Sequence, residues 1–78
     1  MNKRPLYEIA HDIHNSWKPR VNPYAVPYLK AMYQLTDADS SYGLDSAEEI
    51  VLRFLCNAGS FRGDRAKALK QELKDYFK

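Results

Sequence analysis

The stretch SAEEIVLRFLCNAG, residues 46–59, decides the fold that we expect for this chain. Its apolar residues recur at steps of three and four, and this spacing places them on one face of an α-helix. They are Ala47, Ile50, Val51, Phe54, Leu55 and Ala58. Ser46 and Glu49 have the spacing of a capping box at the helix start, and Gly59 suits the left-handed position after its end. We therefore expect a helix over 46–58 that buries this face.

The second helix is harder to place, because several prolines surround its start. Proline inside a helix removes a hydrogen bond and clashes with the preceding turn. The helix therefore covers either 23–36, with a kink at Pro27, or 27–36 after a short turn at 23–26.

Two further helices are expected at the ends of the chain. The first covers 5–16 and stops before Lys18, because a residue that precedes proline is driven out of helical geometry. The last covers 61–77 and begins after Ser60, a residue type that caps helix starts. No stretch alternates with the period of a strand. The sequence therefore predicts an all-α, small four-helix bundle, with 1–78 as a single helical domain.

The composition is that of an ordinary globular chain. Of its 78 residues, 45 % are apolar and 28 % are charged, which is too apolar for a disordered segment. No run of about 18 apolar residues is present, so we expect no membrane contact. The single Cys56 cannot form an intramolecular disulfide, which agrees with a cytoplasmic protein. The net charge of +2 is too small to indicate a partner by itself.

The acidic loop at 37–48 has oxygen-bearing side chains at the spacing of an EF-hand calcium loop. These candidate calcium ligands are Asp37, Asp39, Ser41, Asp45 and Glu48. However, Tyr42 stands at the sixth place, where the sharp turn needs glycine, and the glycine comes one residue later. The sequence favours a plain turn in which Asp45 or Ser46 caps the next helix, and a calcium-binding helix–loop–helix is the weaker alternative.

Lysines recur at steps of three and four on the last expected helix. They are Lys67, Lys70, Lys74 and Lys78. Such a basic stripe can follow the phosphate backbone of a nucleic acid. The alternative is a solvated face whose lysine stems cover apolar surface. A helix-turn-helix is disfavoured, because Arg65 falls where the second helix should bury an apolar side chain.

No catalytic or cofactor site can be assembled from the sequence. It contains no arrangement of nucleophile, base and orienting acid, no glycine-rich phosphate loop, and no convincing pair of acid and base. We therefore expect a protein that is not an enzyme and needs no cofactor.

The chain is rich in tyrosine, with six in 78 residues, and several of them cluster around the second helix. Tyrosine is enriched in protein–protein contacts when it is exposed. Tyr24 and Tyr28 are therefore candidates for binding a protein partner, which could be a second copy of the chain in a homodimer.

Several short motifs, spread over nearly the whole chain, together resemble those of a known family. They are Tyr7-Glu8-Ile9-Ala10, the segment 27–32, Tyr42-Gly43-Leu44-Asp45-Ser46, Ile50-Val51, Phe54-Leu55, Asn57-Ala58, Phe61-Arg62-Gly63, Ala66 and Leu69-Lys70-Gln71-Glu72-Leu73. In these motifs the chain resembles a family of small uncharacterised proteins from tailed phages and prophages of Gram-positive bacteria. The resemblance implies a phage accessory protein in the cytoplasm of the host cell, with no catalytic residues to carry over. It also favours a turn-and-cap role for the 37–48 loop, and it marks Arg62 as a residue that pairs with an acid or faces a partner.

The leading functional hypothesis from the sequence is a protein–protein interaction module of phage or prophage origin. The alternative is a nucleic-acid-binding protein that uses the lysine stripe of the last helix. Binding of calcium at 37–48 is the weakest of the three hypotheses.

Overall fold

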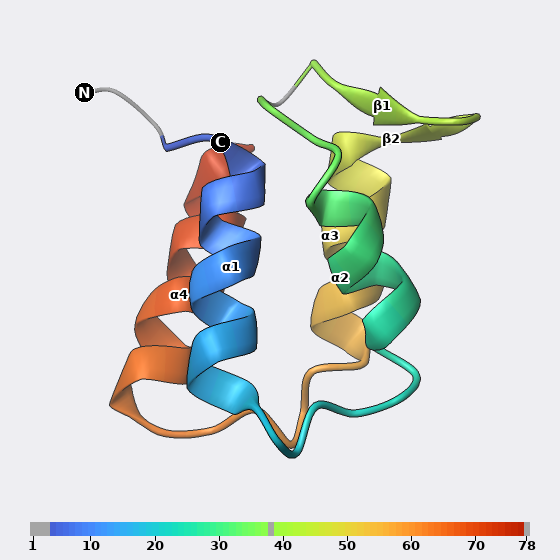
Figure 1. The fold of residues 1–78 in the computed structure, drawn as a ribbon. Helices are drawn as coiled ribbons and strands as arrows, with labels where there is room; N and C mark the ends of the chain where they lie inside the picture. Colours follow the sequence, from blue (N-terminus) through green and yellow to red (C-terminus); the bar gives the residue numbers. More distant parts are fainter. Residues whose placement is uncertain (1–3, 38, 78) are drawn as a thin grey trace.

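The computed structural model describes residues 4–37 and 39–77, and this part of the chain forms four helices and one short β-hairpin (Figure 1). The elements are α1 (Leu6–Trp17), α2 (Val26–Met32), β1 (Ser41–Tyr42), β2 (Asp45–Ser46), α3 (Ala47–Cys56) and α4 (Asp64–Tyr76). The protein is therefore mostly helical, as predicted. The all-α class is wrong, however, because the two-stranded hairpin precedes α3.

The helices are arranged as two neighbouring pairs. Helix α1 packs against α4, α2 packs against α3, and contacts between α1 and α2 join the pairs. Figure 1 shows that the α1–α2 loop and the α3–α4 loop lie at the same end of the molecule, whereas the hairpin lies at the opposite end. Two loops that are distant in the sequence therefore share one end of the fold.

All four helices contribute to one hydrophobic core. The apolar stripe predicted for the third helix is buried at Ala47, Ile50, Val51 and Phe54, and Leu55 is half-buried. At the loop end, the Trp17 ring stacks on the Phe61 ring with 5.0 Å between centroids and meets Phe54 edge-on at 6.2 Å. This aromatic group fastens the α3–α4 loop to α1 and α3.

The start of α3 is confirmed and its end is not. The Ser46 hydroxyl accepts a hydrogen bond from the Glu49 N–H at 3.2 Å, as an N-cap does. The helix ends at Cys56, before the predicted residue 58, and Asn57 closes it with a φ of −107°. The left-handed role predicted for Gly59 is wrong, because Gly59 does not have a positive φ.

Helix α2 follows a short turn, which confirms the second of the two alternatives. The Asn22 side chain accepts a hydrogen bond from the Tyr24 N–H at 3.0 Å, and Pro27 lies in the first turn of the helix, where its missing N–H costs nothing.

The helix ends at Met32, so the predicted end near Thr36 is wrong. The carbonyls of Leu35 and Thr36 instead accept hydrogen bonds from the N–H groups of Tyr7 and Leu6, at 3.0 and 2.9 Å. Helix α1 has no side-chain cap, so these two carbonyls satisfy donors at its start.

Helix α4 begins at Asp64 rather than at residue 61, and Ser60 does not cap it. Phe61 is buried with 2 % of its surface exposed, which holds the residues before α4 in an irregular loop. Gly63 is the N-cap residue, with φ 108° and ψ 175°. Only glycine adopts this backbone conformation easily.

The hairpin pairs Ser41 with Ser46 and Tyr42 with Asp45 in antiparallel register. Gly43 has a φ of +64° at the first central position of the two-residue turn, which is the place where such turns require glycine. Each strand has two residues, which is too short for an alternating pattern to show in the sequence.

Candidate nucleic-acid interface

The structure does not bring the candidate calcium ligands together. The Asp37 carboxylate accepts a hydrogen bond from the Asp39 N–H at 3.0 Å, as in a local turn, and Ser41 and Asp45 lie on the two strands of the hairpin. Glu48 is exposed in the first turn of α3. In residues 4–37 and 39–77, no three histidine, cysteine, aspartate or glutamate side chains lie close enough to hold a metal ion.

The candidate partner-binding residues differ in their exposure. Tyr24 is 77 % exposed, whereas Tyr28 is half-buried against the core. Arg62 is exposed, and its Nε donates a hydrogen bond to the Gly59 carbonyl at 3.3 Å. Of the two roles left open for Arg62, pairing with an acid is not seen among the residues that the structure describes.

The lysine stripe of α4 is only partly a solvated face. Lys67 and Lys74 are exposed, and Lys78 lies outside the described residues. Lys70 is half-buried, with its Nζ 5.8 Å from the centroid of the Phe61 ring. Burial lowers the pKa of Lys70, and the positive charges of Lys74 and Arg62 lower this pKa further. Lys70 is therefore repelled by one cation of its own helix and by one of the preceding loop.

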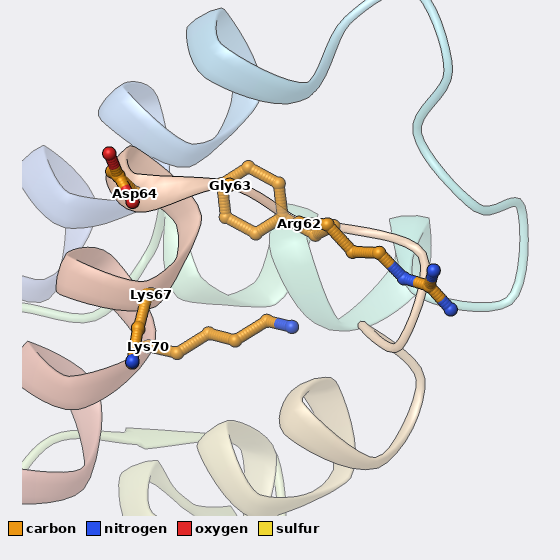
Figure 2. Close-up of a pocket in the computed structure, with 6 residues that line it drawn as sticks. Arg62, Gly63, Asp64, Lys67 and Lys70 are labelled. Atoms are coloured by element: carbon orange, nitrogen blue, oxygen red, sulfur yellow. The ribbon is translucent and has the colours of Figure 1, made fainter.

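A hollow of about 330 Å³ lies beside these cations, at the start of α4. Its lining is Phe61, Arg62, Gly63, Asp64, Lys67 and Lys70. Figure 2 shows the side chains of Arg62 and Lys70 running toward the same side, while the Asp64 side chain points the other way. The lining of the hollow thus includes three cationic residues and one acidic residue, Asp64, whose side chain points away from those of Arg62 and Lys70.

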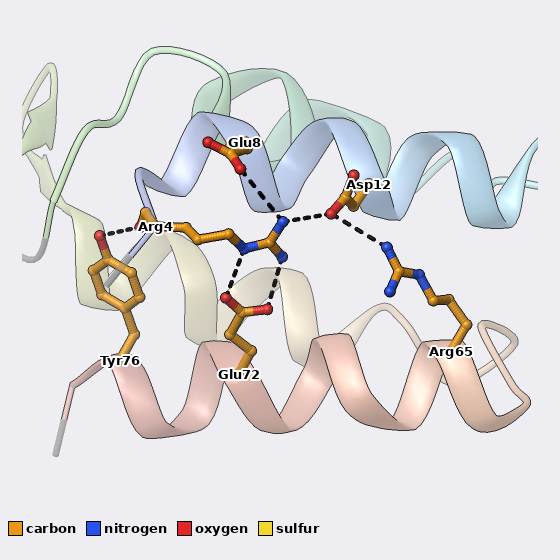
Figure 3. A network of polar contacts seen from close by, with 6 residues as sticks. All are labelled: Arg4, Glu8, Asp12, Arg65, Glu72 and Tyr76. Carbon is orange, nitrogen blue, oxygen red and sulfur yellow. Dashed lines mark hydrogen bonds and ion pairs between the residues drawn. The ribbon is translucent and has the colours of Figure 1, made fainter. Parts of the chain in front are cut away.

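Most arginines elsewhere in the protein are neutralised by carboxylates. Arg4 contacts Glu72 at 2.7 Å and Asp12 at 2.6 Å, and Arg65 contacts Asp12 at 3.3 Å (Figure 3). On α3, Arg53 pairs with Glu49 at 2.8 Å. The sequence did not predict the network around Arg4, because its members come from opposite ends of the chain.

The remaining cations form no ion pair within the described part of the chain, and most of them lie around one end of the fold. They are Lys18, Arg20, Lys30, Arg62, Lys67, Lys70 and Lys74. Lys18 and Arg20 follow Trp17, the last residue of α1, whose ring stacks on Phe61 of the α3–α4 loop. The α1–α2 loop to which they belong is joined to the α3–α4 loop by a hydrogen bond. In that bond, Asn22 Nδ2 donates to the Asn57 carbonyl at 3.1 Å. We call Lys18, Arg20, Arg62, Lys67 and Lys70 the basic end.

The acidic residues are concentrated away from the basic end. Residues 37–49 contain five carboxylates and no lysine or arginine. The hairpin and the first turn of α3, which carry three of these carboxylates, lie at the hairpin end of the fold (Figure 1). Residues 13–36 contain no aspartate or glutamate. Although the net charge is only +2, many of the negative charges are therefore separated from the positive charges of the basic end. This separation could have been found by comparing the charges of successive segments, and sequence reasoning missed it.

Comparisons of this chain with protein-family models, curated proteins and solved structures found no match. The resemblance to phage proteins stays a prediction. Within residues 4–37 and 39–77, none of the helices has the length and apolar character needed to cross a bilayer.

Proposed function

We propose that this protein binds nucleic acid and that the basic end contacts the phosphate backbone. The observation that supports this most directly is the set of cations gathered by two docked loops and the start of α4, with no carboxylate paired to them among the described residues. Of the lysine stripe predicted from the sequence, Lys67 and Lys70 belong to the basic end, and Lys18, Arg20 and Arg62 join them there.

The electrostatics of Lys70 explain why an anion would bind here. Its charge is disfavoured by partial burial and by the neighbouring charges of Arg62 and Lys74. A phosphate group in the hollow would offset this repulsion and would meet the donors of Lys67 and Lys70. Contacts of this kind release counterions from the nucleic acid, so they supply affinity without reading sequence.

The test is a binding titration with fluorescently labelled oligonucleotides of mixed sequence, at 50 and 200 mM salt. Replacing Arg62 and Lys70 together by glutamine should weaken binding, and the salt dependence should fall by about 0.7–0.9 for each phosphate contact removed. Lys30→Gln is the control, because it removes an exposed charge of α2 that forms no ion pair among the described residues and is not part of the basic end. Absence of binding at 50 mM salt, or equal effects of the double variant and the control, would refute the proposal.

A second candidate function is the protein–protein interaction module. It is favoured by Leu44, which is fully exposed at the tip of the hairpin, in a turn position where polar residues are usual. Leu52 on α3 is also 56 % exposed. If a second copy covers the tip of the hairpin, light scattering should show a dimer that Leu44→Ser dissociates.

Both candidate functions are forms of binding without catalysis. The role of a phage or prophage accessory protein is part of this proposal and rests on the resemblance of the sequence motifs alone.

A further inference from the structure

We infer that the nucleic acid bound at the basic end is single-stranded and that the Tyr24 ring stacks on one of its bases. This inference rests on the proposed function and names the kind of nucleic acid that the same surface takes.

Tyr24 is presented to solvent on a backbone that is held in place. The Tyr24 N–H donates to the Asn22 side chain at 3.0 Å, and the same side chain donates to the Asn57 carbonyl at 3.1 Å. The next residue, Ala25, is completely buried. The residue as a whole is 77 % exposed, compared with 43 % for Tyr7 and 49 % for Tyr42. The fold thus anchors the backbone on both sides of Tyr24 and leaves the aromatic ring uncovered.

The position of Tyr24 links it to the unpaired cations. It lies in the same α1–α2 loop as Lys18 and Arg20, and Asn22 of this loop is hydrogen-bonded to the carbonyl of Asn57, at the start of the loop that carries Arg62. No carboxylate occurs in residues 13–36 to repel a phosphate that approaches Tyr24. An exposed aromatic ring beside a track of cations is the combination with which proteins bind single strands, because the ring stacks on a base while the cations follow the backbone.

The same geometry disfavours a duplex. In a duplex the faces of the bases are covered by their neighbours, so a ring such as Tyr24 finds no base to stack on. The cations of the basic end lie on loops and on the first turns of α4, and Arg65 on that helix is held by Asp12 at 3.3 Å. Helix α4 therefore does not present a full row of free side chains to a major groove.

The experiment compares one labelled sequence as single-stranded DNA, single-stranded RNA and duplex DNA, with the full chain at 50 mM salt. We expect a single strand to bind more tightly than the duplex, and the DNA and RNA arms show which sugar is preferred. Tyr24→Leu should weaken binding of the single strand by about 5- to 150-fold, the value of one base stack. Tyr24→Phe should retain binding, because it keeps the ring.

Two controls separate stacking from other effects. Tyr7→Leu removes another exposed tyrosine, from α1, and should leave binding unchanged. A strand without bases should bind the wild type and Tyr24→Leu equally, because it offers nothing to stack on. Thermal melts of each variant show that the fold is kept.

The outcomes distinguish this inference from the proposed function. Tight duplex binding, or an unchanged affinity of Tyr24→Leu for the single strand, overturns the inference, and the proposed function still stands if the Arg62 and Lys70 variants lose binding. If no nucleic acid binds at low salt, both fail, and Tyr24 is left as a contact for a protein partner.

Discussion

Arg4 and Glu72 are separated by 68 positions in the sequence, and their side chains form a two-point ion pair between the start of α1 and the second half of α4 (Figure 3). Arg4 Nε donates to Glu72 Oε2 at 2.9 Å, and Nη2 donates to Oε1 at 2.7 Å. The parallel geometry makes this pair stronger than a single contact, but both side chains are about one-third exposed and solvent weakens it.

Glu72→Gln should therefore lower the free energy of unfolding by about 1 kcal/mol, which in a chain of this size lowers Tm by about 4–8 °C. The loss arises because a neutral amide meets Arg4 where a carboxylate did. Calorimetry of Arg4→Gln, Glu72→Gln and the double variant measures the coupling between the two residues. Purely additive effects would contradict a direct interaction.

The stability of the protein should depend on Asp12 at low pH. The hydrogen bond from Arg4 lowers the pKa of this carboxyl, and the charges of Arg4 and Arg65 lower it further. A carboxyl with a lowered pKa in the folded state stabilises the fold above its unfolded pKa, and this contribution is lost as pH falls through the folded value. The loss should begin below about pH 4.

Asp12→Asn should remove this part of the pH dependence. We expect the variant to be less stable than the wild type at pH 7, and the difference between their urea midpoints should shrink at pH 3. A difference that stays constant from pH 7 to pH 3 would show that the Asp12 charge does not contribute.

Gly63→Ala should destabilise the fold by about 1–3 kcal/mol for conformational reasons alone. An added Cβ at Gly63 meets no atom within 4 Å, so no steric contact contributes. The cost comes from the φ of 108°, which residues with a side chain rarely adopt.

Gly59→Ala is the matched control, because its site is equally open and does not have a positive φ. It should be neutral or stabilise the fold by about 0.4–1 kcal/mol. Chemical denaturation of both variants checks the contrast, and equal effects would contradict it.

Tyr76→Phe should destabilise the fold by about 1–2 kcal/mol. The Tyr76 hydroxyl lies 2.7 Å from the carbonyl oxygen of Arg4 and 3.2 Å from that of Thr36, and the residue is 4 % exposed. Phenylalanine keeps the ring and removes the donor that ties α4 to the start of α1 and to the residues after α2. Tyr7→Phe, at a residue that is 43 % exposed, is the control and should leave the melting temperature unchanged.

The helices that the sequence predicted best are those whose signals are local. The periods of three and four in α1 and α3 reflect contacts between consecutive turns and a common core face, and the cap at Ser46 joins residues three apart. These interactions need no information about the rest of the fold. The lysines at 67, 70 and 74 were found for the same reason.

The residue at which α2 ends and the residue at which α4 begins depend on contacts with residues that are distant in the sequence. Residues 35–36 leave the helical path to accept hydrogen bonds from α1, and Phe61 leaves it to stack on Trp17. The hairpin was missed because a pair of two-residue strands carries no period. At residues 35–36 and at Phe61, the backbone departs from the helical conformation that the local sequence favours. The observed conformation is more stable because it satisfies hydrogen-bond donors of α1 or buries an aromatic ring.

The candidate site divides in the same way. The sequence by itself determined four helices, the apolar faces that build the core, and a row of lysines on the last helix. Only the tertiary structure decided that Lys18 and Arg20 lie at the same end as Arg62, because that depends on contacts of the α3–α4 loop with Trp17 at the end of α1 and with Asn22 in the α1–α2 loop. It also decided two of the ion pairs, since Glu72 reaches Arg4, and Asp12 reaches Arg65, only after α1 and α4 have packed together.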